Sequence, residues 1–224
     1  MGVLLDTKVQ PEAVGKKEIM SNSNKTINTY IITIDVVRHG EKNDDTMTER
    51  GAEQIRATAV ELTLAEGPRD VGLLVHSGAN RTMQAIAIIA DTFGYDPVFA
   101  FPDDKFNFTN LIGPSGGKDV VLAEIAKVQS EGDTVALALA SSKYARLARD
   151  QITHAILALA RDVIENGYSR AVVTSHGPYT ELAAVNPEQM PYGICEGDWV
   201  RYEVVDGQII SSTLHRCPIP GRRN

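Results

Sequence analysis

Apolar segments with two different periods alternate along the chain from about Thr29 onward. The run TYIITIDVV, residues 29–37, is almost continuously apolar and rich in β-branched residues, which is typical of a strand that is buried on both faces. Residues 48–67 instead carry apolar side chains at near-helical spacing, and Gly67-Pro68 stops this pattern. The two stretches therefore predict a buried strand that is followed by a helix.

The same alternation continues toward the C-terminus. We expect further strands at residues 71–77, 96–102 and 170–177, and helices at residues 80–94, 118–130 and 141–167. Residues 198–215 predict a β-hairpin around Asp206-Gly207. Strands that alternate with helices of this size predict an α/β fold, in which a largely parallel sheet is covered on both faces.

Length and local composition predict one folded domain with an N-terminal extension. The chain has 224 residues, which suits a single α/β domain. Residues 1–28 are mixed and polar, and we interpret them as a loose N-terminal tail that precedes a domain at residues 29–224. The tail lacks the basic-then-apolar order of a signal peptide, so the default prediction is a cytoplasmic protein.

Composition argues against several classes of partner. The net charge is −7 and no basic face is evident, which argues against nucleic-acid binding. No segment reaches about eighteen continuous apolar residues, so no membrane-spanning helix is predicted. Cys195 and Cys217 form no CxxC motif and have no ligand-like histidine spacing. We therefore expect no metal site and a reducing compartment, with one disulfide as the alternative.

Charged and polar residues directly follow three of the predicted strands. Arg38-His39-Gly40 ends the first strand, and Ser77 ends the second, with Arg81 one turn into the next helix. His176 ends the strand near residue 175. In a mostly parallel sheet, ligands bind beyond the carboxyl ends of the strands. We therefore expect two histidines and two arginines to converge at one edge of the sheet.

These residue types suit chemistry on a phosphoryl group. Arginine presents a planar fork of donors that matches two phosphoryl oxygens at once. A neutral histidine can attack phosphorus and carry the phosphoryl group covalently, when a hydrogen bond fixes its other ring nitrogen. A second histidine, if protonated, can stabilise the equatorial oxygens, and a carboxylic acid can protonate the leaving group. The scheme requires neither a metal ion nor a cofactor.

The strand-end motifs also resemble those of a known family. VVRHGEK followed by MTERGAEQ, then HSGANRTMQAIA and VVTSHG, are similar in sequence and order to motifs of the histidine phosphatase superfamily, also called phosphoglycerate mutase-like. The resemblance implies a three-layer α/β/α sandwich around a mostly parallel sheet. It implies that His39 is the phosphoacceptor and His176 the second catalytic histidine. It also implies that Arg38, Arg81 and Ser77 bind the substrate phosphate.

Two departures from the family pattern bear on the activity. Many members use as general acid a glutamate that follows the second helix and third strand, and no glutamate occupies that stretch here. The segment FPDDKFN offers Asp103 and Asp104 instead, and these are our candidate acids. The first motif is followed by the short acidic segment GEKNDDTM, which lacks the Trp-Asn pair of the mutase and argues against a glycolytic mutase.

Together, the motifs predict a metal-independent phosphatase that hydrolyses a phosphomonoester through a phosphohistidine on His39. The alternatives are a phosphohistidine phosphatase, which works without the acid, a phosphoglycerate mutase-like phosphotransferase, and a non-catalytic phospholigand-binding protein. The expected substrate is a small phosphorylated metabolite or a phosphoprotein, and the sequence indicates no oligomeric state. Residues 95–140 match the family least, so we assign specificity to them, with NLIGPSGGKD as either a mobile lid or an ordinary loop.

Overall fold

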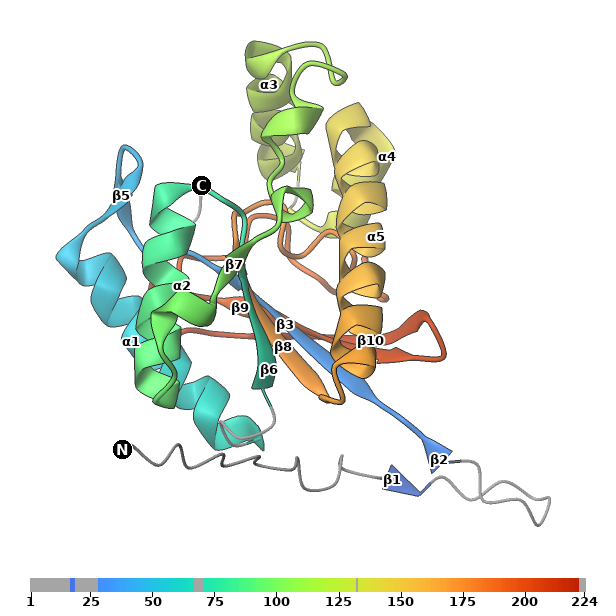
Figure 1. The fold of residues 1–224 in the computed structure, drawn as a ribbon. Coiled ribbons are helices and arrows are strands. Elements are labelled where there is room, and N and C mark those ends of the chain that lie inside the picture. Colours follow the sequence, from blue (N-terminus) through green and yellow to red (C-terminus); the bar gives the residue numbers. More distant parts are fainter. Residues whose placement is uncertain (1–16, 19–27, 67–70, 132, 222–224) are drawn as a thin grey trace, which may run out of the picture.

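The computed structural model describes residues 17–18, 28–66, 71–131 and 133–221, and a six-stranded sheet forms its centre (Figure 1). The strands run across the sheet in the order β10-β9-β3-β8-β6-β7. Their bounds are β3 Ile32–Arg38, β6 Val71–His76, β7 Phe101–Pro102, β8 Arg170–Ser175, β9 Trp199–Val205 and β10 Gln208–His215. The strands β3, β8, β6 and β7 are parallel, and β9 and β10 add an antiparallel hairpin beside β3. The prediction of a mostly parallel sheet is confirmed.

Helices cover both faces of this sheet. The helices α1 (Glu49–Glu66) and α2 (Asn80–Phe93) lie on one face, and α5 (Lys143–Glu165) lies on the other (Figure 1). In β3, Ile34 and Val36 belong to the apolar cluster of α5, whereas Val37 belongs to the cluster of α1 and α2. Alternating side chains of one strand thus fill two cores, which explains the continuous apolar run. The predicted three-layer sandwich is confirmed.

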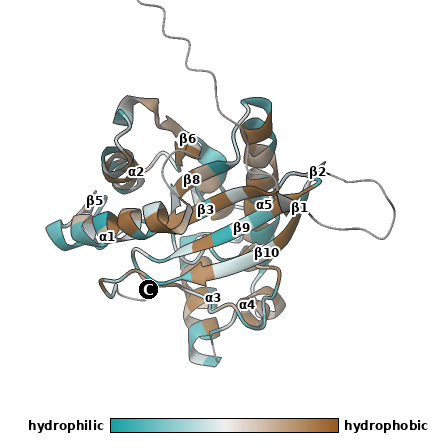
Figure 2. Ribbon diagram, turned by 90° about the horizontal axis from the view of Figure 1, so that it is seen from below, coloured by the Kyte–Doolittle hydropathy of each residue, from teal (hydrophilic) through white to brown (hydrophobic). Residues whose placement is uncertain are grey.

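The hydropathy colouring of Figure 2 agrees with this burial. The central strands β3 and β8 are mostly hydrophobic, and every residue of both strands is buried. The strand β9 carries hydrophilic stretches, and its exposure alternates along its length. The hairpin of β9 and β10 lies where the sequence predicts it. Asp206 (φ 49°) and Gly207 (φ 75°) both adopt the left-handed conformation that a two-residue hairpin turn requires.

The strand that we predicted at residues 96–102 is largely wrong. Pro97–Phe99 form a 3₁₀ helix (η2), and only Phe101–Pro102 pair with β6 at the sheet edge. The two prolines lack the N–H groups that a longer strand would donate to its neighbour. The chain then forms two further 3₁₀ helices, η3 (Asp104–Phe106) and η4 (Thr109–Leu111), before α3 (Lys118–Glu131).

A separate helix precedes α5, and the sequence pattern did not predict it. This helix, α4 (Val135–Ser141), begins where Thr134 Oγ1 accepts a hydrogen bond from Leu137 N. Ser142 lies between the two helices in an extended conformation, and its Oγ caps α5 by accepting from Ala145 N (3.0 Å). The helix predicted at residues 141–167 is therefore α5, and the capping serine Ser142 separates it from α4.

Two very short strand pairs complete the described structure. Lys42–Asn43 (β4) and Thr46–Met47 (β5) form a hairpin immediately after the first motif. Lys17–Glu18 (β1) pair with Asn28–Thr29 (β2), and the rest of the predicted tail, residues 1–28, lies outside the described residues.

The described ranges can be compared with what a membrane-spanning helix, a metal site and a disulfide require. No helix there is long and apolar enough to cross a membrane. No three histidine, cysteine or acidic side chains in those ranges group as a metal ion would require. Cys195 and Cys217 are both free thiols.

Candidate active site

The three predicted strand ends meet at the carboxyl edge of the sheet. Because β3 and β8 are parallel neighbours with Arg38 opposite Ser175, the residues that follow them are adjacent. The N–H of His39 donates to the carbonyl of Ser175 (3.1 Å). The rings of His39 and His176 lie edge to face, with centroids 5.3 Å apart. The convergence expected from the sequence is therefore present for the two histidines.

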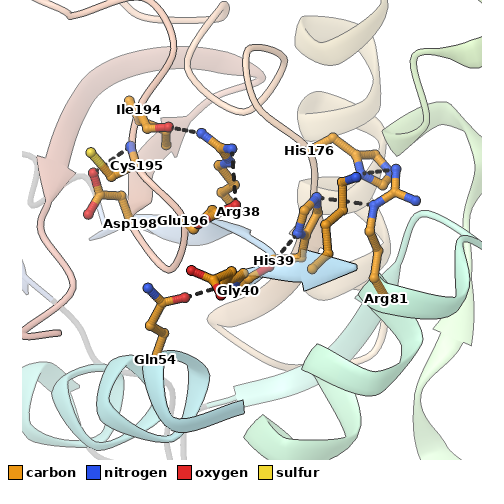
Figure 3. Close-up of polar contacts among 12 residues, drawn as sticks. Arg38, His39, Gly40, Gln54, Arg81, His176, Ile194, Cys195, Glu196 and Asp198 are labelled. Carbon is orange, nitrogen blue, oxygen red and sulfur yellow. Dashed lines mark hydrogen bonds and ion pairs between the residues drawn. The ribbon is translucent and has the colours of Figure 1, made fainter. Parts of the chain in front are cut away.

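The guanidinium of Arg81 joins the two histidines. Its Nε donates to Nε2 of His39 (3.1 Å), and its Nη2 lies 3.1 Å from Nδ1 of His176 (Figure 3). Its Nη1 forms an ion pair with the carboxylate of Asp45. The first turn of α2 thus supplies a guanidinium group whose three nitrogens contact His39, His176 and Asp45.

Hydrogen bonds fix the tautomer of His39. Arginine is always a donor, so Nε2 of His39 accepts from Arg81, and the ring proton resides on Nδ1, which contacts the carbonyl of Gly40 (2.8 Å). Burial lowers the pKa of the His39 imidazole to about 3, and the nearby charges of Arg81 and Arg38 act in the same direction. His39 is therefore neutral, with the lone pair of Nε2 directed toward the place where Arg81 would hold an anion.

His176 is held by a chain of hydroxyl groups. Its Nε2 lies 2.8 Å from Oγ of Ser77, and that hydroxyl lies 3.0 Å from Oγ1 of Thr82. Since Nδ1 accepts from Arg81, Nε2 donates to Ser77. Burial is the main cause that lowers the pKa of His176 well below its ordinary value, so this histidine is neutral as well. Ser77 lies behind His176 and orients it, while phosphate binding by Ser77 stays a prediction.

Arg38 lies deeper than Arg81. Its side chain is 1% exposed, and its guanidinium donates to the carbonyl of Ile194 and lies 3.9 Å from Oε1 of Glu196. Figure 3 shows this guanidinium turned toward Ile194, whereas that of Arg81 lies beside the histidine rings. Phosphate binding by Arg38 stays a prediction. In the structure, its charge lowers the pKa of both histidines, as a smaller contribution than burial.

The two candidate acids lie in the segment after β7. One Asp103 carboxylate oxygen accepts from Lys105 N (3.0 Å), which caps the short helix η3, and the other lies 3.6 Å from Nζ of Lys105. Asp104 is exposed. These described contacts are local to the segment, and a role for Asp103 or Asp104 as general acid stays a prediction.

Other residues of the motifs support the loop that carries His39. A Cβ atom at Gly40 would lie 2.2 Å from the carbonyl oxygen of Gly51, and one at Gly51 would lie 2.1 Å from that of Glu41. Both positions therefore require glycine for the loop to touch α1. Gln54 Oε1 accepts from the N–H of Glu41 (2.8 Å). Gln84 Oε1 accepts from the N–H of Met47 (2.9 Å). The polar motif residues on α1 and α2 thus fix the backbone just before β4 and within β5.

Sequence reasoning missed two charged residues of the short hairpin. Asp45 is in direct contact with Arg81, and the charge of Lys42 lowers the pKa of both histidines as a minor contribution. Both residues are exposed, Lys42 on the two-residue strand β4 and Asp45 in the turn after it, where no periodic pattern marks them. The adjacency of GEKNDD to the histidine motif was the available signal.

An aromatic side chain from the variable region 95–140 borders His176. The ring of Phe108 lies edge to face with that of His176, with centroids 5.3 Å apart. Its neighbours on the other side are Tyr144 and Tyr179, at centroid distances of 6.3 and 6.5 Å. Phe108 of this segment therefore supplies an apolar side chain beside His176.

No protein-family model and no curated protein matches the chain by sequence. Solved structures do match its fold. Phosphoglycerate mutase from Bacillus anthracis is 15% identical, with a TM-score of 0.56, covering 84% of this chain and 92% of its own. A phosphoserine phosphatase from Entamoeba histolytica, in complex with 3-phosphoglyceric acid, is 12% identical (TM-score 0.53; 84% and 98% covered). The protein histidine phosphatase SixA, complexed with tungstate, is 16% identical (TM-score 0.50; 83% and 95% covered).

These similarities concern the fold. At 12–16% identity, they show that the chain adopts the phosphoglycerate mutase-like fold of the histidine phosphatases and mutases. The fold that the sequence motifs implied is confirmed. What the chain does must be argued from the residues at its sheet edge.

Proposed function

We propose that this chain, with its phosphoglycerate mutase-like fold, hydrolyses phosphomonoesters through a phosphohistidine on His39. The observation that carries the proposal is the state of His39, whose Nε2 lone pair faces the guanidinium of Arg81 while its Nδ1 is held by Gly40. A nucleophilic histidine needs this tautomer and this neutral state. A purely structural histidine does not require an arginine at its acceptor nitrogen.

A bound phosphoryl group would take over the donors of Arg81. The Nε and Nη2 groups that now meet the two histidines would turn to phosphoryl oxygens, in the forked geometry that arginine favours. His39 Nε2 then forms a bond to phosphorus as the bond to the leaving oxygen breaks. Water attacks the phosphohistidine in the second step and releases inorganic phosphate. Arg81, rather than a protonated His176, supplies the positive charge on the equatorial oxygens.

The experiment replaces His39 with alanine and measures phosphate released from p-nitrophenyl phosphate. His154→Ala is the matched control, because His154 is an exposed histidine whose Nδ1 contacts the Asp150 carbonyl on α5. We expect the His39 variant to lose activity at least about 10³-fold, and the control to keep it. Acid-quenched wild type should also carry acid-labile phosphate on His39.

Three other results would decide against the proposal. If the pure wild type binds phosphate but turns over no ester in a broad panel, the chain is a phospholigand-binding protein. If it acts on phosphohistidine peptides and on no ester, it is a protein phosphatase. If it transfers the phosphoryl group to a second metabolite without releasing phosphate, it is a mutase-like transferase.

A further inference from the structure

The turn between β4 and β5 brings a carboxylate directly onto the arginine of the candidate active site. Oδ1 of Asp45 accepts from Nη1 of Arg81 in an ion pair. The hairpin itself is attached to α2, because the N–H of Met47 donates to Gln84 Oε1, and Asn80 Nδ2 lies 3.5 Å from Thr46 Oγ1. The carboxylate thus belongs to a turn that is fixed beside the site.

The charged groups around Asp45 come from four elements. Arg81 of α2 contacts it, and Lys42 and Asp44 share its hairpin, where Nζ of Lys42 donates to the Asp44 carbonyl (3.2 Å). Beyond Arg81 lie His39, after β3, and His176, after β8, and burial lowers the pKa of both. Near pH 7, the two histidines are therefore neutral. Asp45 is then the carboxylate in direct contact with the arginine that would hold the substrate phosphate.

We propose that Asp45 is the general acid and base of the reaction, in place of Asp103 and Asp104. This inference rests on the phosphatase activity proposed above. A phosphoryl group on Nε and Nη2 of Arg81 would share this guanidinium with the Asp45 carboxylate, which is held by Nη1. A phosphoryl group and a carboxylate that are held by one guanidinium repel each other, and a proton shared between them removes the repulsion. Because a phosphomonoester dianion takes up one proton near pH 6, the substrate can bring that proton with it.

The proton then has a defined path. In the first step, Nε2 of His39 forms the bond to phosphorus, the bond to the leaving oxygen breaks, and the proton held by Asp45 passes to that oxygen. The leaving group departs as a neutral alcohol, and Asp45 becomes a carboxylate. In the second step, Asp45 takes a proton from water while the water oxygen attacks phosphorus and the N–P bond breaks. The side chain of Asp45 is 59% exposed, which lets water reach it.

The test compares leaving groups in two variants of one turn. Asp45→Asn removes the carboxylate that meets Arg81, and Asp44→Asn removes the same charge from the adjacent exposed position. Asp44 has a φ of 51°, a conformation that asparagine tolerates. p-Nitrophenolate leaves without a proton, whereas the alkoxide of glycerol 3-phosphate needs one. We expect Asp45→Asn to lower kcat/KM about 10²-fold for glycerol 3-phosphate and less than about 5-fold for p-nitrophenyl phosphate.

The pH profile provides the second measurement. For the wild type, kcat/KM with glycerol 3-phosphate should fall above about pH 6, where the ester loses its proton. Asp45→Asn should flatten this fall, because the ester dianion then meets no carboxylate at Arg81, and Asp44→Asn should leave the fall unchanged.

Equal losses on both esters, or the same result for Asp44→Asn, would overturn the role of Asp45 and leave the phosphatase activity intact. A wild type that turns over no ester in a broad panel would overturn both proposals together.

Discussion

Asp35 and Asp45 lie ten positions apart in the chain, and each is bound by arginine, but in opposite surroundings. The side chain of Asp35 is 0% exposed inside β3, where Arg170 (2.7 Å) and Arg201 (2.8 Å) donate to its two oxygens. The side chain of Asp45 is 59% exposed on a two-residue turn, with Arg81 as its partner. The first cluster lies within the sheet and the second at its carboxyl edge.

The difference shows that the same aspartate–arginine pair stabilises the fold when it is buried and can exchange with a ligand when it is exposed. Removing water from Asp35 and its arginines is costly, so each charge there depends on the others being present. Arg170 also donates to the carbonyl of Leu62, which ties the cluster to α1. The exposed pair at Asp45 contributes little to folding, because water and salt compensate for its loss. Its partner is therefore available to exchange with a ligand.

The largest expected effect comes from removing the charge inside the sheet. Asp35→Asn leaves two arginines of β8 and β9 beside a neutral amide in a buried position. We expect the free energy of unfolding to fall by about 3–5 kcal/mol, because a buried pair that is broken on one side leaves an uncompensated charge. Urea denaturation followed by circular dichroism measures the change. A loss below about 1 kcal/mol would show that the cluster is hydrated like a surface pair.

In a second buried carboxylate, that of Glu181, burial raises the pKa more than the nearby charge of Arg38 lowers it. Glu181 is fully buried, and its Oε1 accepts from the N–H of Gly193 (2.6 Å). Burial raises the pKa of the Glu181 carboxyl to about 7, against an ordinary value of 4.5. Between these two values, the folded protein holds a proton that the unfolded chain has released. Its contribution to stability is therefore complete below about pH 4.5 and is lost as the pH rises through 7.

The Glu181→Gln variant has no such proton to lose. Relative to this variant, the wild type should lose stability between pH 5 and 8, by an amount on the order of 2–3 kcal/mol. Glu188→Gln, at an exposed position of the same loop, is the control and should follow the wild type. A constant difference between Glu181→Gln and the wild type at both pH values would contradict the raised pKa.

The smallest expected effect belongs to the exposed aspartate. Asp45→Asn should change the free energy of unfolding by less than about 0.5 kcal/mol, since exposed ion pairs contribute little. The same urea titration measures it beside Asp35→Asn. A loss comparable to that of Asp35→Asn would mean that the hairpin is part of the folding core, and the contrast between the two aspartates would disappear.

Much of the fold could be predicted from periodicity because most elements are long and bury one or two full faces. The strand β3 and the helices α1, α2 and α5 carry this signal. It failed at residues 96–102, where two prolines remove backbone donors, and it did not predict α4, a short helix that begins after the capping residue Thr134. Local hydrogen bonding decides such places, and it leaves no trace in hydrophobic spacing.

The candidate site, like the fold, could be predicted only in part from the sequence. The topology rule for parallel strands placed His39, Arg81 and His176 at one edge, and the structure brings them into contact. Residue type alone did not reveal that Ser77 lies behind His176, or that Arg38 turns toward Ile194. These are directions of side chains, which depend on packing around the strand ends.

The sequence by itself determined the alternation of strands and helices, the order of the strand-end motifs, and the kind of chemistry that arginine and histidine can perform together. Only the tertiary structure decided which carboxylate meets that chemistry. Asp35, Asp45 and Glu181 are all acidic, and the number of arginines within reach and the water around each one separate them. Those two quantities arise from contacts between residues far apart in the chain, so no local pattern encodes them.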